Sequence, residues 1–184
     1  MPVLPAPSKE DVIAATREWL EKEVIGLNLC PFAQAVHAAG QIRYFVSEAE
    51  TTQALRADLI EELLHLKSVD AAQVDTTLLI HPGVLGDFLE FNDFLDVADD
   101  VVHQLSLGGE FQIASFHPRY QFEGTEPDDV TNRTNRSPYP TLHLLREASV
   151  ERAIESYPDA SEISERNIET MRRLGNPEPP ARNP

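Results

Sequence analysis

Two histidines follow runs of residues that are typical of strands. His81 comes directly after the apolar run 76–80, and His117 comes directly after the alternating run 111–116, each with a proline behind it. Neutral imidazole serves as a general acid or base, and also as a metal ligand. If the strands are parallel, both histidines lie at the edge where open α/β sheets bind ligands. The pattern predicts a catalytic site that contains both side chains; the alternative is that each only bonds to the backbone at a strand end.

Arginine and tyrosine side chains gather in the polar loop 117–140. A loop of this length inside a compact domain is uncommon, and it is usually functional or disordered. The candidate substrate-binding residues in it are Arg119, Tyr120, Arg133, Arg136 and Tyr139. A guanidinium binds carboxylate or phosphate through two parallel hydrogen bonds, so we expect a pocket for a small anion with the loop as its lid. The alternative is that the arginines pair with acidic residues within 123–129 and only fix the loop.

Cys30 is the only cysteine, so no disulfide can form within the chain. It precedes Pro31 at a predicted helix start, where the helix dipole favours the thiolate that a nucleophile or a redox sensor needs. The alternative is a small buried hydrophobic side chain. No short-spaced motif such as H-x-x-x-H joins the histidines to a third ligand, so no metal site is predicted. No glycine-rich phosphate loop points to a particular cofactor.

The composition is that of an ordinary globular protein with an acidic surface. The chain has 184 residues and a formal net charge of −16, which repels phosphate backbones and argues against general nucleic-acid binding and anionic membranes. No apolar run approaches the roughly 18 residues that a membrane span needs. No apolar segment typical of a secretory signal follows the first residues. We therefore expect a soluble, cytoplasmic protein.

The elements that would position these side chains alternate between helix and strand. Strands are predicted over 42–46, 76–80 and 111–116, and helices over about 9–26, 31–38, 51–67, 87–107, 141–147, 149–156 and 160–174. This order predicts an α/β fold with a small, mostly parallel sheet of three strands or slightly more, built from β-α-β-α-β with extra N- and C-terminal helices. We expect a single globular domain over 1–174 and a flexible, proline-rich tail over 175–184.

Four short motifs carry a resemblance to a known family. They are NLCPF at 28–32, FHPRYQF at 116–122, NRSPYP at 135–140 and HLLRE at 143–147. Together they resemble the bacterial and plant family catalogued as domain of unknown function 1415, over about residues 10–155. The resemblance implies a single soluble domain and no particular activity.

Two function hypotheses follow from these residues. In the first, the protein is an enzyme that acts on a small anionic substrate. His117 is the acid or base, with His81 as a second candidate for that role, and the arginines hold the anion under the loop. In the second, the loop recognises a metabolite or a protein partner without any chemistry, and Cys30 senses oxidants.

Overall fold

The computed structural model describes residues 7–157 and 159–175. Its elements are α1 (Lys9–Trp19), the π-helix η1 (Leu20–Ile25), α2 (Ala33–Ala38), β1 (Ile42–Val46), α3 (Thr52–Ser68), β2 (Thr76–Ile80), α4 (Phe88–Gln104), β3 (Phe111–Phe116), the 3₁₀ helix η2 (Val130–Asn135), β4 (Thr141–Arg146), α5 (Glu147–Ser156), η3 (Ala160–Glu162) and α6 (Ile163–Leu174). Apart from Gly175, the predicted tail 175–184 lies outside the described residues. No helix in the part described is both long and apolar enough to cross a membrane.

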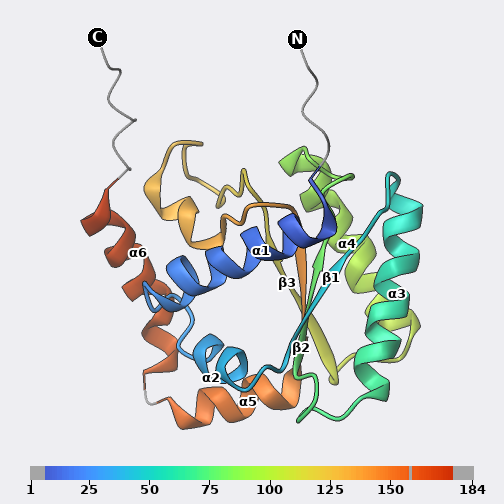
Figure 1. The fold of residues 1–184 in the computed structure, drawn as a ribbon. Helices are drawn as coiled ribbons and strands as arrows, with labels where there is room; N and C mark the ends of the chain where they lie inside the picture. Colours follow the sequence, from blue (N-terminus) through green and yellow to red (C-terminus); the bar gives the residue numbers. More distant parts are fainter. Residues whose placement is uncertain (1–6, 158, 176–184) are drawn as a thin grey trace, which may run out of the picture.

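The fold is a mixed α/β structure around one four-stranded sheet, in the order β1-β2-β4-β3 (Figure 1). Strand β2 is parallel to β1, whereas β4 is antiparallel to both of its neighbours, β2 and β3. The predicted α/β class is confirmed, and four strands fit the expected three or slightly more. The prediction of a mostly parallel sheet is wrong, because two of the three pairings are antiparallel. However, β3 runs in the same direction as β1 and β2, so the carboxyl ends of these three strands share one edge.

The extra strand comes from a segment for which a helix is predicted. Residues 141–147 form β4 and only the first residue of α5, because the segment lies between β2 and β3 and pairs with β2 over 141–145 and with β3 over 141–146. Leu142 and Leu144 alternate onto one face of the sheet and are fully buried there. Backbone hydrogen bonds on two sides and burial of alternate residues outweigh the helical spacing of the leucines.

Two layers of helices cover the sheet. Helices α3 and α4 pack on one face and enclose the largest part of the core, in which Leu55, Leu79 and Phe91 are fully buried. Helix α1 and η1 cross the opposite face, where Val12 and Trp19 are buried (Figure 1). The faces follow from the strands, in which successive side chains point to opposite sides of the sheet.

The predicted helix starts on both faces are confirmed by their caps. Ser8 and Asp11 bond reciprocally at the start of α1 as a capping box. The Thr51 hydroxyl accepts from the backbone of α3, and the Asp87 carboxylate accepts from two amides at the start of α4. Helix α1 continues into η1, which ends at Gly26.

Candidate functional site

The two histidines predicted from the sequence lie in one buried cluster. His81 follows β2 and His117 follows β3 at the shared carboxyl edge, both on the face that α3 and α4 cover, and neither is exposed to solvent. Both rings pack on the ring of Phe91, with centroids 5.7 Å and 5.0 Å away. The loop 117–140 returns between them, because Thr141 at the start of β4 pairs with the last residues of both strands.

Hydrogen bonds fix the tautomer of each ring. The backbone N–H of Arg119 donates to Nδ1 of His117 at 3.0 Å, so Nε2 carries the proton and donates to the carbonyl of Leu85 at 3.1 Å. Nδ1 of His81 lies 3.1 Å from the carbonyl of Val84, to which only a protonated nitrogen can donate. Nε2 of His81 is then an acceptor, and it is buried without a partner among the described residues.

Both histidines are neutral at physiological pH. Burial lowers the pKa of His81 to about 4, against a smaller opposing effect of the Val84 carbonyl. Burial also lowers the pKa of His117; the Leu85 carbonyl opposes this shift and the charge of Arg119 adds to it. Each imidazole therefore keeps one donor and one acceptor nitrogen.

The loop between β2 and α4 is held by three side chains in succession. The carbonyls of residues 84–86 accept in turn from His81, His117 and Nη2 of Arg119, the last at 2.6 Å. Leu85, in the middle, has a φ of 59°, a left-handed conformation that a branched side chain rarely adopts. Through these carbonyls the loop contacts both imidazole rings and helps to shield them from solvent.

His143 lies on the other face of the sheet. Its Nε2 is 2.7 Å from the Thr76 hydroxyl, and its ring packs near that of Phe116. Although the residue as a whole is only partly buried, its ring lies within the packed layer, and burial lowers its pKa to about 4. It therefore lies apart from His81 and His117, and no group of three His, Cys, Asp or Glu in the described ranges is placed to hold a metal ion.

The three arginines do not converge on one pocket. Arg119 binds the Gly86 carbonyl and lies 3.7 Å from the Asp87 carboxylate. Arg136 donates to two backbone carbonyls of the loop, those of Tyr120 and Pro127. These two guanidinium groups therefore fix the loop, as one interpretation of the sequence expects, but mainly through carbonyls instead of the acidic residues within 123–129.

The two tyrosines pack into the protein. The ring of Tyr120 lies 5.2 Å from that of Phe88 and 5.0 Å from that of Phe122. Tyr139 packs against the core beneath α1. Between the two tyrosines, Asn132 links three parts of the loop. It is fully buried and forms hydrogen bonds with the Phe122 amide, the Thr125 hydroxyl and the Glu126 carbonyl. The loop is thus an ordered part of the fold.

Cys30 lies away from both histidines, on the α1 face. It is partly buried beside the cluster that contains Trp19 and Val24. Helix α2 begins at Ala33 instead of the predicted Pro31 and has six residues, so Cys30 does not directly precede a helix start. The structure thus removes the dipole argument for a reactive thiolate at this position.

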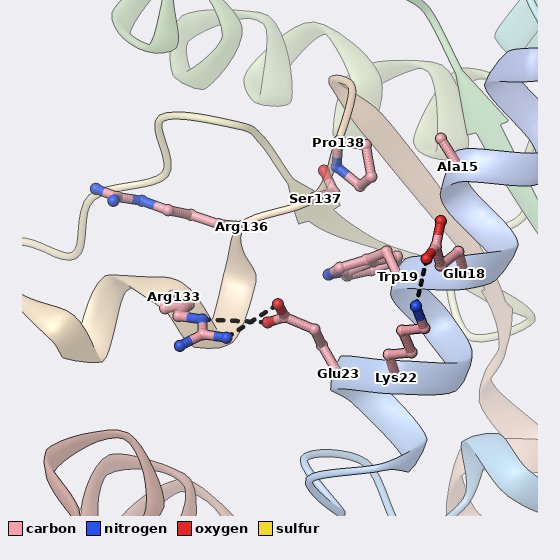
Figure 2. A pocket seen from close by; sticks show the side chains of 9 residues that line it. All are labelled: Ala15, Glu18, Trp19, Lys22, Glu23, Arg133, Arg136, Ser137 and Pro138. Atoms are coloured by element: carbon pink, nitrogen blue, oxygen red, sulfur yellow. Dashed lines mark hydrogen bonds and ion pairs between the residues drawn. The ribbon is translucent and has the colours of Figure 1, made fainter. Parts of the chain in front are cut away.

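An open cleft lies on the α1 face of the protein, between α1–η1 and the end of the loop 117–140. It has a volume of about 480 Å³ and is lined by Ala15, Glu18, Trp19, Lys22, Glu23, Arg133, Arg136, Ser137 and Pro138 (Figure 2). Nε and Nη2 of Arg133 bind the two carboxylate oxygens of Glu23 at 3.3 Å and 3.0 Å. The indole nitrogen of Trp19 faces the side of the cleft that Arg133 occupies, whereas the Arg136 side chain extends away from it (Figure 2).

This cleft contains only part of the predicted pocket. Arg133 and Arg136 are the predicted binding residues that line it, but Trp19 and Glu23, which also line it, have no counterpart in the sequence-based prediction. Glu23 lies 110 positions from Arg133 in the chain, and no periodicity connects the two. The one local signal is the spacing of Glu18 and Lys22, four residues apart on a helix, and it indicates an ordinary surface ion pair.

Comparison with known proteins places the chain in a family without assigning it an activity. No curated protein and no solved structure matches it. The family model described as "Protein of unknown function (DUF1415)" matches residues 11–179. Because this match covers nearly the whole chain, including the histidine edge and the cleft, the protein belongs to the DUF1415 family.

Proposed function

We propose that the protein binds a small molecule with a carboxylate or phosphate group in the cleft between α1–η1 and the loop, without chemistry there. One observation carries the proposal. The guanidinium of Arg133 forms a two-bond fork with the single carboxylate of Glu23, and both side chains stay about 30 % exposed, at 30 % and 31 %. An incoming anionic group can take the place of Glu23 in the same geometry.

The surroundings of Arg133 support this use. A volume of about 480 Å³ falls within the range of roughly 300–1,000 Å³ that is typical of small-molecule sites. The indole N–H of Trp19 adds a second donor on the same side (Figure 2). Lys22 and Glu23 belong to the π-helix η1, and such irregular turns are often found at functional sites.

Trp19 allows a direct test, because it is the only tryptophan in the chain. Its fluorescence should change saturably when phosphate or citrate is added to the wild type. Arg133→Gln should weaken binding roughly 10–100-fold, since hydrogen bonds to charged groups contribute about 1.5–3 kcal/mol. Arg152→Gln, on the exposed side of α5, is the matched control and should bind like the wild type. Unchanged binding by Arg133→Gln would refute the proposal.

A second candidate function is the histidine-based enzyme. The observation that favours it is the buried Nε2 of His81, an acceptor with no partner in the described part of the chain, which could take a proton from a substrate if residues 81–87 opened. Diethyl pyrocarbonate acylates neutral imidazole that solvent reaches, and exposed His103 serves as an internal reference. Modification of His81 faster than global unfolding supports this function, whereas protection of His81 until the protein unfolds argues against it.

A further inference from the structure

The charged side chains that face the cleft form pairs of opposite sign, and this limits the kind of charge that its ligand can carry. Glu18 and Lys22 form one ion pair and Glu23 and Arg133 form another. Arg136 also lines the cleft, but its guanidinium binds two loop carbonyls and its side chain extends away from Trp19 and Glu18 (Figure 2). The cleft therefore offers a carboxylate for each of the two cations that face it, unlike a site built only for anions.

A bare anion gains less from this arrangement than a ligand that also gives Glu23 a partner. When it takes the place of Glu23 on Arg133, it forms one ion pair and breaks another, and it leaves a half-buried carboxylate without a partner. Such a carboxylate loses the interactions that compensated its desolvation. The net charge of −16 on the whole chain also repels a free anion.

On the basis of the proposed function, we infer that the ligand of this cleft is a small zwitterion, with an ammonium group beside its anionic group. The anionic group binds Arg133 and the indole N–H of Trp19, and the ammonium binds the released carboxylate of Glu23. Every charge then keeps a partner. A molecule without net charge also does not experience the repulsion from the acidic surface.

The geometry limits the distance between the two ligand charges. Nη2 of Arg133 and Oε1 of Glu23 are in direct contact at 3.0 Å. A ligand that inserts between them must carry its opposite charges close together, on two groups attached to the same carbon atom, as an α-amino acid does. Glu18 lies on the same wall of the cleft as Glu23, the one formed by α1–η1 (Figure 2). Its exposed ion pair with Lys22 is of a kind that contributes little to stability, so Glu18 can serve as a second partner for the ammonium.

Three ligands with a matched carbon skeleton test the inference: L-alanine, propionate and ethylamine, each titrated against the full chain with Trp19 fluorescence as the readout. L-alanine should bind at least tenfold more tightly than either of the others. Glu23→Gln should abolish this preference, weakening L-alanine binding while propionate binds as well as before or better. Arg133→Gln should weaken both carboxylates. Exposed Glu151→Gln on α5 is the control and should keep the wild-type order.

The wild-type titration decides the question even if a variant does not fold, which circular dichroism will reveal. Propionate binding as tightly as L-alanine, and weakened by Arg133→Gln, would refute the zwitterion and leave the proposed anion site intact. A preference for L-alanine that survives Glu23→Gln would refute the role of Glu23. The absence of any response to the three ligands, to phosphate and to citrate would refute the proposed function itself.

Discussion

His117 donates a hydrogen bond from Nε2 to the carbonyl oxygen of Leu85 at 3.1 Å, and Leu85 is held in the left-handed region with a φ of 59°. Strained backbone of this kind costs about 1–3 kcal/mol and persists only where neighbouring groups hold it. The bond therefore explains why an imidazole follows β3. A fully buried ring with both nitrogens bonded is well suited to supporting the β2–α4 loop, and that support can be measured.

Replacing His117 with alanine should lower the free energy of unfolding by about 3 kcal/mol, the usual cost of truncating a buried ring. The substitution removes the contact with Phe91 and leaves the Leu85 carbonyl without its donor. Urea unfolding measures the loss. His103→Ala, at an exposed position of α4, should change stability by less than about 0.5 kcal/mol. A loss below about 1 kcal/mol for His117→Ala would show that the ring does not support the loop.

Asn132 should prove to be the residue on which the order of the long loop depends. Its amide makes hydrogen bonds to three other loop residues while fully buried. Asn132→Ala leaves the partly buried Phe122 amide and Glu126 carbonyl without their partner, at a cost of about 1–3 kcal/mol. Hydrogen exchange should then become faster across residues 118–135. Asn92→Ala, exposed on α4, is the matched control; equal protection of the loop in both variants would contradict this role.

The sequence predicts the histidine edge because each of its parts is local. Residues 76–80 form a continuous apolar run and residues 111–116 alternate, and both strands have the predicted bounds. The convergence of His81 and His117 depends only on the common direction of these strands. That direction survives the insertion of β4, since two antiparallel pairings restore it.

The rest could not be predicted because it depends on pairings between distant segments. Residues 141–146 have leucines that fit either a helix or a strand, and the choice is made by hydrogen bonds to β2 and β3, whose positions a local pattern does not contain. The cleft depends on Arg133 meeting Glu23 across 110 positions. A lone arginine in a polar loop gives no indication of which carboxylate it will bind.

Gly26 should not tolerate a side chain, although it is close to helical backbone. Its φ is −61°, and a Cβ added there would lie 2.2 Å from the carbonyl oxygen of Lys22. Gly26→Ala should therefore destabilise the protein by about 2 kcal/mol, as overpacking does. In the interior of an ordinary helix, by contrast, replacing glycine with alanine stabilises by about 1 kcal/mol. It should also alter Trp19 fluorescence, because η1 forms one wall of the cleft.

The matched control for this substitution is Gly86→Ala, where an added Cβ meets no atom within 4 Å. This variant should be as stable as the wild type or slightly more stable, since alanine restricts the unfolded chain. Thermal unfolding of the two variants gives the comparison. Equal stabilities would mean that the end of η1 can relax to accept a side chain.

Stability should fall as the pH decreases from about 6.5 to 4, because His81 and His143 are buried as neutral rings. Burial lowers the pKa of each from 6.5 to about 4, so the unfolded chain binds protons in this range and the folded protein does not. Stability therefore increases with pH between the two values and is complete above about 6.5. A full shift of this size corresponds to about 3 kcal/mol for one histidine.

Urea unfolding from pH 7.5 to 4.5 should show the decline, and His81→Gln should make it shallower, whereas His103→Gln should not. A wild-type stability that stays constant between pH 6.5 and 4.5 would mean that both rings can take up a proton within the folded protein.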